Sequence, residues 1–165
     1  SEKVDTMIIQ AVALLEDLDK ELNNYAMRLR EWYSWHFPEL ARIITDNCTY
    51  AQAVILIGMR TNVKDLTLQQ MEAVMPADIA EQVKEAAEIS MGTEIIKDDE
   101  MHIKTLARTV NDITEYRANL AEYLKNRMAA VAPNLTILIG ELVAAKLIAH
   151  SGSLMNLAKQ PASTI

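Results

Sequence analysis

The sequence contains few of the residues that interrupt helices or build sheets. Its 165 residues include only four glycines, four prolines and one phenylalanine, whereas β-rich proteins need many turn residues and aromatic residues. Alanine, leucine, isoleucine, glutamate and methionine are abundant instead, and these residues favour helices. Half of the chain is hydrophobic and 24% is charged, a balance that is typical of a folded protein. We therefore predict an all-α fold.

Further absences exclude several classes of function. A single cysteine, Cys48, excludes an intrachain disulfide and any multi-cysteine metal site. No uncharged apolar run reaches about 18 residues, so we predict no membrane-spanning helix, and no signal peptide is recognisable. The sequence has no Glu-x-x-His pair, no His-Glu-x-x-His motif and no phosphate-binding or dinucleotide-binding loop. We predict a protein that is not an enzyme and that needs no cofactor or metal.

Two long stretches repeat apolar residues every seven positions. In the stretch from about Asp99 to Ala132, the two columns are Ile103, Val110, Arg117, Leu124 and Val131, and Leu106, Ile113, Leu120 and Arg127. At the start of the chain, the two columns are Val4, Ala11, Leu18, Tyr25 and Trp32, and Ile8, Leu15, Leu22 and Leu29. Such a repeat predicts helices that pack against each other along a narrow seam.

We predict that the two stretches form a long antiparallel coiled-coil hairpin, with a small helical tip over residues 38–95. The alternative is a compact bundle of ordinary helices. The hairpin is favoured because both repeats persist for about four heptads or more. This gives a coiled-coil domain over residues 1–132, followed at Pro133 by residues 133–165, which we expect to be the incomplete start of a second helical domain. The chain has no initiating methionine and ends just after a Pro-Ala-Ser-Thr stretch, so we expect a piece of a longer protein.

Helix signals divide the tip into short segments. Pro38 suits the first turn of a helix to about Ile44, and Asp46 and Gly58 suit the start and the end of the next one. We expect a loop over residues 60–65. The spacings Thr67-x-x-Gln and Asp78-x-x-Glu read as capping boxes that open helices over about 68–74 and 79–90, with a glycine at position 92 to stop the second.

An aromatic segment precedes the tip. Residues 29–40 contain three aromatic residues around His36 within a few positions, together with the seam residue Trp32. This segment is either a hydrophobic corner where the hairpin meets its tip or an aromatic binding platform. We favour the corner, with His36 as a packing or capping residue.

The charge is unevenly distributed. Residues 125–165 hold four basic residues and one acidic residue, so they carry +3 of the net charge of −7 and the rest carries −10. The net charge argues against nucleic-acid binding along the whole chain, but an acidic rod leads into a mildly basic end, and if any part contacts RNA it is this end. Within that end, the Ser/Gly loop near Ser153 either caps a short helix or holds a phosphate through backbone N–H groups.

Five segments lie in order along nearly the whole chain, at residues 29–40 (Leu-Arg-Glu-Trp-Tyr-Ser-Trp-His-Phe-Pro-Glu-Leu), 87–94 (Ala-Glu-Ile-Ser-Met-Gly-Thr-Glu), 115–117 (Glu-Tyr-Arg), 130–135 (Ala-Val-Ala-Pro-Asn-Leu) and 148–164. Together they resemble the Nop family, the core scaffold proteins of box C/D small nucleolar ribonucleoproteins. The resemblance identifies residues 133–165 as the start of a Nop domain and implies a nuclear, nucleolar protein.

The resemblance also implies partners. The coiled coil pairs with that of a Nop paralogue of the nucleolar protein 56 type, and the Nop domain grips guide RNA that carries a kink-turn-binding protein. Fibrillarin is held through a further domain of the family, for ribose 2′-O-methylation of rRNA. For the RNA or protein contacts we predict His150, Ser151, Ser153, Asn156, Lys159 and Gln160, and for dimerisation Tyr116 and Tyr123.

Two other functions remain open at this point. A spliceosomal relative of the pre-mRNA processing factor 31 type would share the architecture, although the Trp-Tyr-Ser-Trp-His-Phe-Pro stretch from Trp32 argues against it. A plain helical interaction module would have no RNA role. An acidic or disordered continuation after Ile165 would favour that interpretation.

Overall fold

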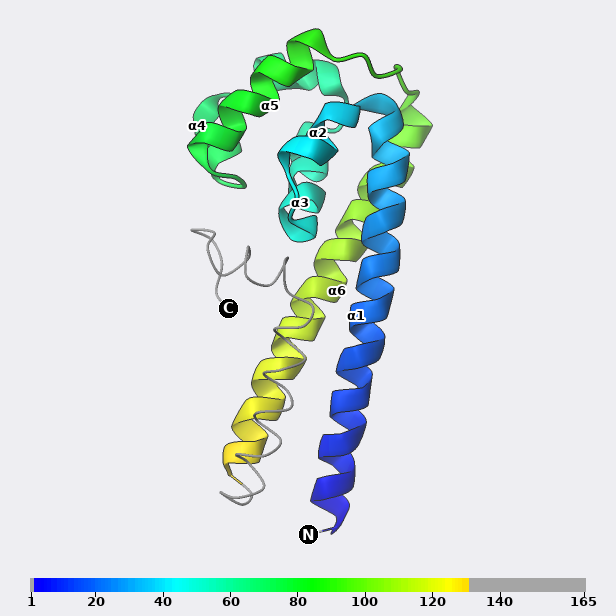
Figure 1. The fold of residues 1–165 in the computed structure, drawn as a ribbon, viewed down its shortest axis with the longest axis vertical. Coiled ribbons are helices and arrows are strands. Elements are labelled where there is room, and N and C mark those ends of the chain that lie inside the picture. The colour runs from blue at the N-terminus through cyan, green and yellow to red at the C-terminus, as the bar shows by residue number, and fades with distance from the viewer. Residues whose placement is uncertain (1, 131–165) are drawn as a thin grey trace.

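A computed structural model describes residues 2–130 as an all-helical hairpin with a small tip, as predicted (Figure 1). Helices α1 (Glu2–His36) and α6 (Lys97–Ala129) run antiparallel, side by side. Each is about 50 Å long at 1.5 Å per residue. Between them lie the tip helices, which are α2 (Pro38–Ile43), α3 (Asn47–Ile57), η1 (Arg60–Asp65), α4 (Leu68–Glu72) and α5 (Ala77–Ile89).

Several helix ends follow the predicted signals. Asp46 caps α3, and its carboxylate accepts the backbone N–H of Thr49 at 2.8 Å. Gly58 ends α3 with a φ of 63°, a conformation that residues with a Cβ rarely adopt. Thr67 and Gln70 form the predicted capping box at the start of α4. These local signals were reliable because each one satisfies backbone groups that a helix end leaves unpaired.

Three predictions about the tip were wrong. Residues 60–65 are not a loop but a 3-10 helix, which buries Val63 and accepts a hydrogen bond from Lys84 at its carbonyl. The second capping box does not form, because extended Pro76 occupies the cap position and α5 begins one residue before Asp78. Gly92 does not stop α5 either, since the helix already ends at Ile89.

Two hydrophobic cores hold the hairpin together. The larger core lies where the tip packs on the upper part of the hairpin, and its largest fully buried side chains include Tyr33, Phe37 and Tyr50. The smaller core lies further along the hairpin and consists of Ile8, Val12, Leu15, Ala121, Leu124 and Met128. Burying one large apolar side chain contributes about 1.5–3 kcal/mol, so these cores fix how α1 and α6 pair.

The seam between α1 and α6 differs by one residue from the predicted one. The columns that begin at Ile8 and Ile103 are confirmed over the described residues, whereas Val4 and Val131 lie outside those whose side chains are described. The second column on each helix lies one position further toward the C-terminus, although Leu18 and Leu106 of the predicted columns are buried as predicted. It consists of Val12, Asp19, Ala26 and Tyr33 on α1 and of Ala107, Thr114, Ala121 and Met128 on α6. Trp32, predicted in the seam, is 39% exposed.

The connector from α5 to α6, residues 90–96, is fastened to the end of α1. The backbone N–H of Thr93 donates to the carbonyl of Trp35 at 3.0 Å. His36 is buried; its Nδ1 donates to the carbonyl of Thr93 at 2.7 Å and its Nε2 accepts the N–H of Arg60 at 2.8 Å. Glu39 accepts hydrogen bonds from the Ser90 hydroxyl and the Met91 N–H. His36 is therefore a packing residue, as predicted, whereas Trp35 beside it is exposed.

Candidate functional site

The predicted RNA-contacting residues lie outside the described part of the chain. His150, Ser151, Ser153, Asn156, Lys159 and Gln160 all fall after residue 130, and so does the whole of the predicted second domain, residues 133–165. Their assignment stays a prediction from the sequence. The candidate site that the structure describes is the surface of the hairpin.

Tyr116 and Tyr123 lie one heptad apart on α6, and both are largely exposed. Their exposed fractions are 54% and 53%, values that are high for large aromatic side chains. Ile113 lies three residues before Tyr116, and Leu120 lies three residues before Tyr123. Both are half-buried. These four residues form an apolar stripe beside the seam, on the helix face where residues three and four apart are neighbours.

Helix α1 adds a second stripe on the same side. Ala11, Leu18, Tyr25 and Trp32 each come directly before a residue of the shifted seam column, as Ile113 and Leu120 do on α6. In an antiparallel helix pair, such positions face the same side of the seam. The ring of Trp32 stacks on that of His102 from α6, with centroids 6.4 Å apart, which confirms that this side of α1 adjoins α6. Ala11 and Leu120 both pack against the smaller core.

We call this surface the flanking face. It consists of Met7, Ala11, Leu14, Leu18 and Tyr25 of α1 with Ile113, Tyr116, Leu120 and Tyr123 of α6, and four of these residues, Met7, Leu14, Tyr116 and Tyr123, are exposed. Of the flanking-face residues that the sequence assigned to the seam, Ala11, Tyr25, Ile113 and Leu120 are therefore only half-buried, whereas Leu18 is buried as predicted. An apolar surface that runs along two helices is typical of a site for another protein.

The tip packs on the opposite side of the hairpin. Arg30, which follows the first seam column of α1, donates hydrogen bonds to the Ala41 and Thr45 carbonyls and to the Asn47 side chain. Cys48 of α3 lies 4.0 Å from the side chain of Asn111 of α6. Because these contacts occupy the other flank of the seam, the tip helices leave the flanking face uncovered, and Figure 1 shows them gathered to one side of the hairpin.

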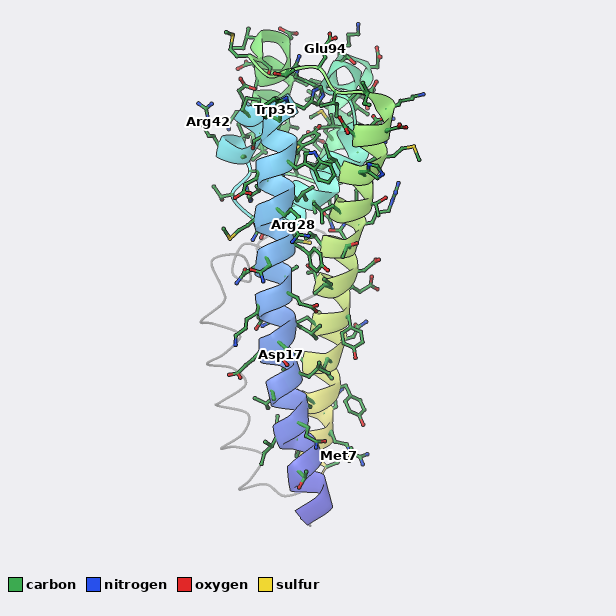
Figure 2. The ribbon with its side chains drawn as sticks, turned by 90° about the vertical axis from the view of Figure 1, so that its right-hand side faces the viewer. Met7, Asp17, Arg28, Trp35, Arg42 and Glu94 are labelled. Carbon is green, nitrogen blue, oxygen red and sulfur yellow. The ribbon has the colours of Figure 1, made fainter. Side chains whose placement is uncertain are left out.

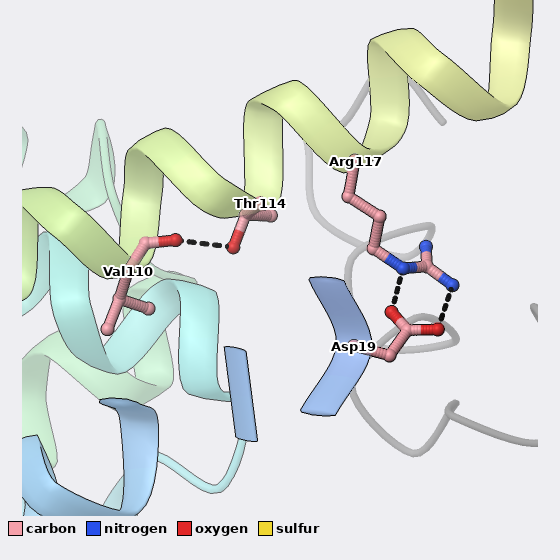
Figure 3. Close-up of polar contacts among 4 residues, drawn as sticks. All are labelled: Asp19, Val110, Thr114 and Arg117. Atoms are coloured by element: carbon pink, nitrogen blue, oxygen red, sulfur yellow. Dashed lines mark hydrogen bonds and ion pairs between the residues drawn. The ribbon is translucent and has the colours of Figure 1, made fainter. Parts of the chain in front are cut away.

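A buried ion pair crosses the seam near its middle (Figure 3). The guanidinium of Arg117 donates two hydrogen bonds to the carboxylate of Asp19, and both side chains are buried. One turn away, the Thr114 hydroxyl donates to the Val110 carbonyl at 2.7 Å. The heptad pattern placed Arg117 in an otherwise aliphatic column but did not indicate its partner. An acidic residue at Asp19 beside Leu18 was the signal that could have found it.

The described residues hold no arrangement that suggests catalysis. Within residues 2–130, no group of three or more His, Cys, Asp or Glu side chains could hold a metal ion. Burial, helped by the Asp46 carboxylate, raises the pKa of the Cys48 thiol to about 11, which keeps it protonated and unreactive at neutral pH. No helix in this part of the chain has the length and apolar character that crossing a bilayer requires.

Comparison with known proteins relates the chain to one family. The family model Nop, described as "snoRNA binding domain, fibrillarin", matches residues 14–165. The chain is 58% identical over 165 residues to nucleolar protein 58 of Candida albicans, covering 100% of this chain and 31% of that protein. It is 60% identical over 164 residues to nucleolar protein 58 of Schizosaccharomyces pombe, covering 99% and 32%, respectively.

The same likeness extends to nucleolar protein 58 of Mycosarcoma maydis, at 57% identity over 164 residues, which covers 99% of this chain and 28% of that protein. The chain spans about a third of the length of the curated relatives it matches. Within the family, residues 88–95 and 123–128 predict a likeness to nucleolar protein 58 rather than to nucleolar protein 56. These relatives confirm the likeness to nucleolar protein 58.

Proposed function

Because the chain belongs to the Nop family, we propose that it is a non-catalytic scaffold of the box C/D small nucleolar ribonucleoprotein. The observation that carries this proposal is the identity of 57–60% along the whole chain to relatives named nucleolar protein 58. Their name refers to the nucleolus, which is the compartment we assign. It also favours this function over that of a spliceosomal relative.

Different segments of the scaffold bind different partners. The hairpin pairs with the coiled coil of a Nop paralogue of the nucleolar protein 56 type. The Nop domain that begins near residue 133 contacts guide RNA and its kink-turn-binding protein. A further domain of the protein holds fibrillarin, so that the stiff rod sets the distance between the RNA-bound end and the methyltransferase during rRNA ribose 2′-O-methylation.

The flanking face is the surface we propose for the paralogue. Tyr116 and Tyr123 lie on it where neither the seam nor the tip uses them, and rigid aromatic side chains of this kind often dominate interface energies. Leu14 and Met7 extend the apolar area along α1. A partner hairpin that packs here would form a four-helix arrangement. The apolar stripe of each helix is wider than one seam, so part of it would be buried inside the hairpin and part against the partner.

Light scattering tests the pairing. We expect this chain and the coiled coil of the paralogue to form a one-to-one complex when mixed, because the flanking face has an apolar area to bury. Replacing both rings in Tyr116→Ala/Tyr123→Ala should weaken the complex about tenfold or more. The matched control is Glu115→Ala/Glu122→Ala, which changes the neighbouring exposed positions on the other flank and should leave the affinity within about twofold.

Three outcomes would each contradict a part of the proposal. If the mixture contains only monomers, the heptads serve the hairpin alone and the scaffold does not pair through this rod. If the full-length protein recovers spliceosomal RNA instead of box C/D RNA from nuclear extract, the function is that of the spliceosomal relative. Equal weakening by the tyrosine and glutamate variants would remove the flanking face from the interface.

A further inference from the structure

A cleft of about 440 Å³ opens where α1, the connector and the start of α6 meet. Its volume lies within the range of ligand pockets, about 300–1,000 Å³. Its lining consists of Arg28, Glu31, Trp32, Trp35, Glu94, Ile95 and Asp99. In Figure 2, Arg28, Trp35 and Glu94 mark this region, toward the end of the hairpin that carries the tip. Neither Tyr116 nor Tyr123 lines the cleft.

Two indole rings give the cleft its apolar surface. Trp35 is 69% exposed, although the hydrophobic effect favours covering so large a ring. Trp32 is partly exposed and is held in place by its stacking on His102. These are the two tryptophans of the whole chain. A flat aromatic surface that water still reaches is suited to a ligand group that stacks.

The charge of the cleft is negative. Glu31, Glu94 and Asp99 come from three different segments and face a single guanidinium, that of Arg28. Arg28 is already placed over the ring of Tyr25, at 5.6 Å from the ring centroid. None of the three carboxylates takes part in an ion pair with another residue of the described chain. The lining therefore repels phosphate groups and favours a cation.

We propose that this cleft binds an arginine side chain from a basic segment of a partner protein. A guanidinium is planar, stacks on indole faces and pairs with carboxylates through several N–H donors, so it matches both features of the lining at once. A lysine ammonium shares the charge but neither the plane nor the fork of donors. The proposal does not depend on the proposed function, because it needs neither RNA nor a paired hairpin.

The walls of the cleft are fixed before any ligand arrives. Glu94 and Ile95 belong to the connector, which the hydrogen bonds between Thr93, Trp35 and His36 fasten to α1. Gly92 permits this approach, since a Cβ at that position would lie 1.8 Å from the His36 carbonyl oxygen. A pocket that needs no reordering loses less entropy when it binds.

Intrinsic fluorescence measures this binding directly, because both tryptophans line the cleft. The probe is a short peptide with several arginines among glycine and serine residues, and the matched peptides carry lysine or the uncharged arginine analogue citrulline. We expect a saturable change in tryptophan emission with the arginine peptide, binding about tenfold weaker with lysine, and no change with citrulline. An arginine peptide that leaves the emission unchanged overturns the proposal.

Paired variants separate a site from general attraction to an acidic protein. Glu31→Gln/Glu94→Gln should weaken arginine-peptide binding about tenfold, whereas Glu81→Gln/Glu85→Gln removes the same charge from the exposed side of α5 and should change it less than about twofold. Trp35→Ala, a change at an exposed position, should weaken binding as measured by calorimetry. The proposal is overturned if both charge variants weaken arginine-peptide binding equally, or if the lysine peptide binds as tightly as the arginine peptide. Neither result bears on pairing with the paralogue.

Discussion

Gly92 shows how one residue fixes the connector. The glycine lies so close to α1 that an added Cβ would meet backbone atoms of His36, which cannot move aside as a flexible side chain would. From the sequence this glycine reads as a helix stop, because its contact with a residue 56 positions earlier cannot be seen from local sequence. Only the folded hairpin brings Gly92 and His36 together.

We expect Gly92→Ala to lower the free energy of unfolding by about 1–3 kcal/mol, through displacement of the connector. Chemical denaturation measures the change. Thr93→Ala is the matched control, since it removes an exposed side chain and keeps the backbone hydrogen bonds of Thr93, and it should cost less than about 0.5 kcal/mol. If the Gly92→Ala variant is as stable as the parent, the connector can move to accommodate the methyl group without lowering the free energy of unfolding.

His36 makes the attachment of the connector to α1 sensitive to acid. Burial lowers the pKa of His36 below its ordinary value of 6.5, although its hydrogen bond to the Thr93 carbonyl partly opposes the shift. The folded protein therefore binds a proton less readily than the unfolded chain. The stabilising contribution of neutral His36 is complete above about pH 6.5 and is lost as the pH falls through the lowered value. Protonated Nε2 would face the N–H of Arg60, which it now accepts.

Thermal unfolding at several pH values between about 5 and 8 tests this dependence. The melting temperature of the parent protein should fall below about pH 6.5 more steeply than that of His36→Asn, which has no group to protonate there. His102→Asn changes an exposed histidine on α6 and should follow the parent. Parallel curves for the parent and His36→Asn would show that His36 does not govern the acid response.

At the scale of elements, the seam shows both the reach and the limit of sequence patterns. The period of seven predicted the helices, their lengths and their pairing, because aliphatic residues such as Ile8, Leu15 and Leu29 recur without a break. The pattern did not decide between neighbouring second columns. The observed column contains Asp19 and Thr114, which read as surface residues, and small alanines, which let the two backbones approach. The more hydrophobic predicted column lies at the edge of the seam, where Leu18 and Leu106 are still buried and most of the other members border the flanking face.

The buried ion pair between Asp19 and Arg117 should respond differently to single and double changes. Arg117→Leu leaves an unpaired buried carboxylate and should lower the free energy of unfolding by about 3–5 kcal/mol. Asp19→Leu/Arg117→Leu removes both charges and should restore most of the stability. Urea denaturation measures both, and Asp17→Leu, at an exposed position two residues away (Figure 2), should change it by less than about 0.5 kcal/mol.

From these expected outcomes we infer that the ion pair selects one pairing of the two helices rather than adding stability. If the double variant is as unstable as the single one, the charges stabilise the hairpin in their own right. If the double variant is stable but no longer pairs with the paralogue through the flanking face, the ion pair orients that face. A buried polar pair that specifies helix pairing is well attested in coiled coils.

At the scale of the whole molecule, the predicted RNA-contacting end remains the part that sequence alone describes. Among the six predicted contact residues between positions 150 and 160, Lys159 is the lysine, and His150 is the other residue that can carry a positive charge. In the full-length protein, Lys159→Glu should weaken binding to the guide RNA with its kink-turn-binding protein, more at low salt than at high salt, because a phosphate contact is lost and a repulsion is added. Gel-shift titrations at several salt concentrations measure it. Unchanged affinity throughout would remove Lys159 from the site.

The hairpin constrains how the length of this rod can change. Each residue turns an α-helix by about 100°, so an insertion of one residue in α6 between Arg117 and Tyr123 would turn the far end of the helix away from both the seam and the partner. Seven residues bring the columns nearly back into line. The rod can therefore grow or shrink only by matched changes in α1 and α6, in steps of about 10 Å. The spacing that such a rod sets can therefore take only certain lengths, separated by about two helical turns.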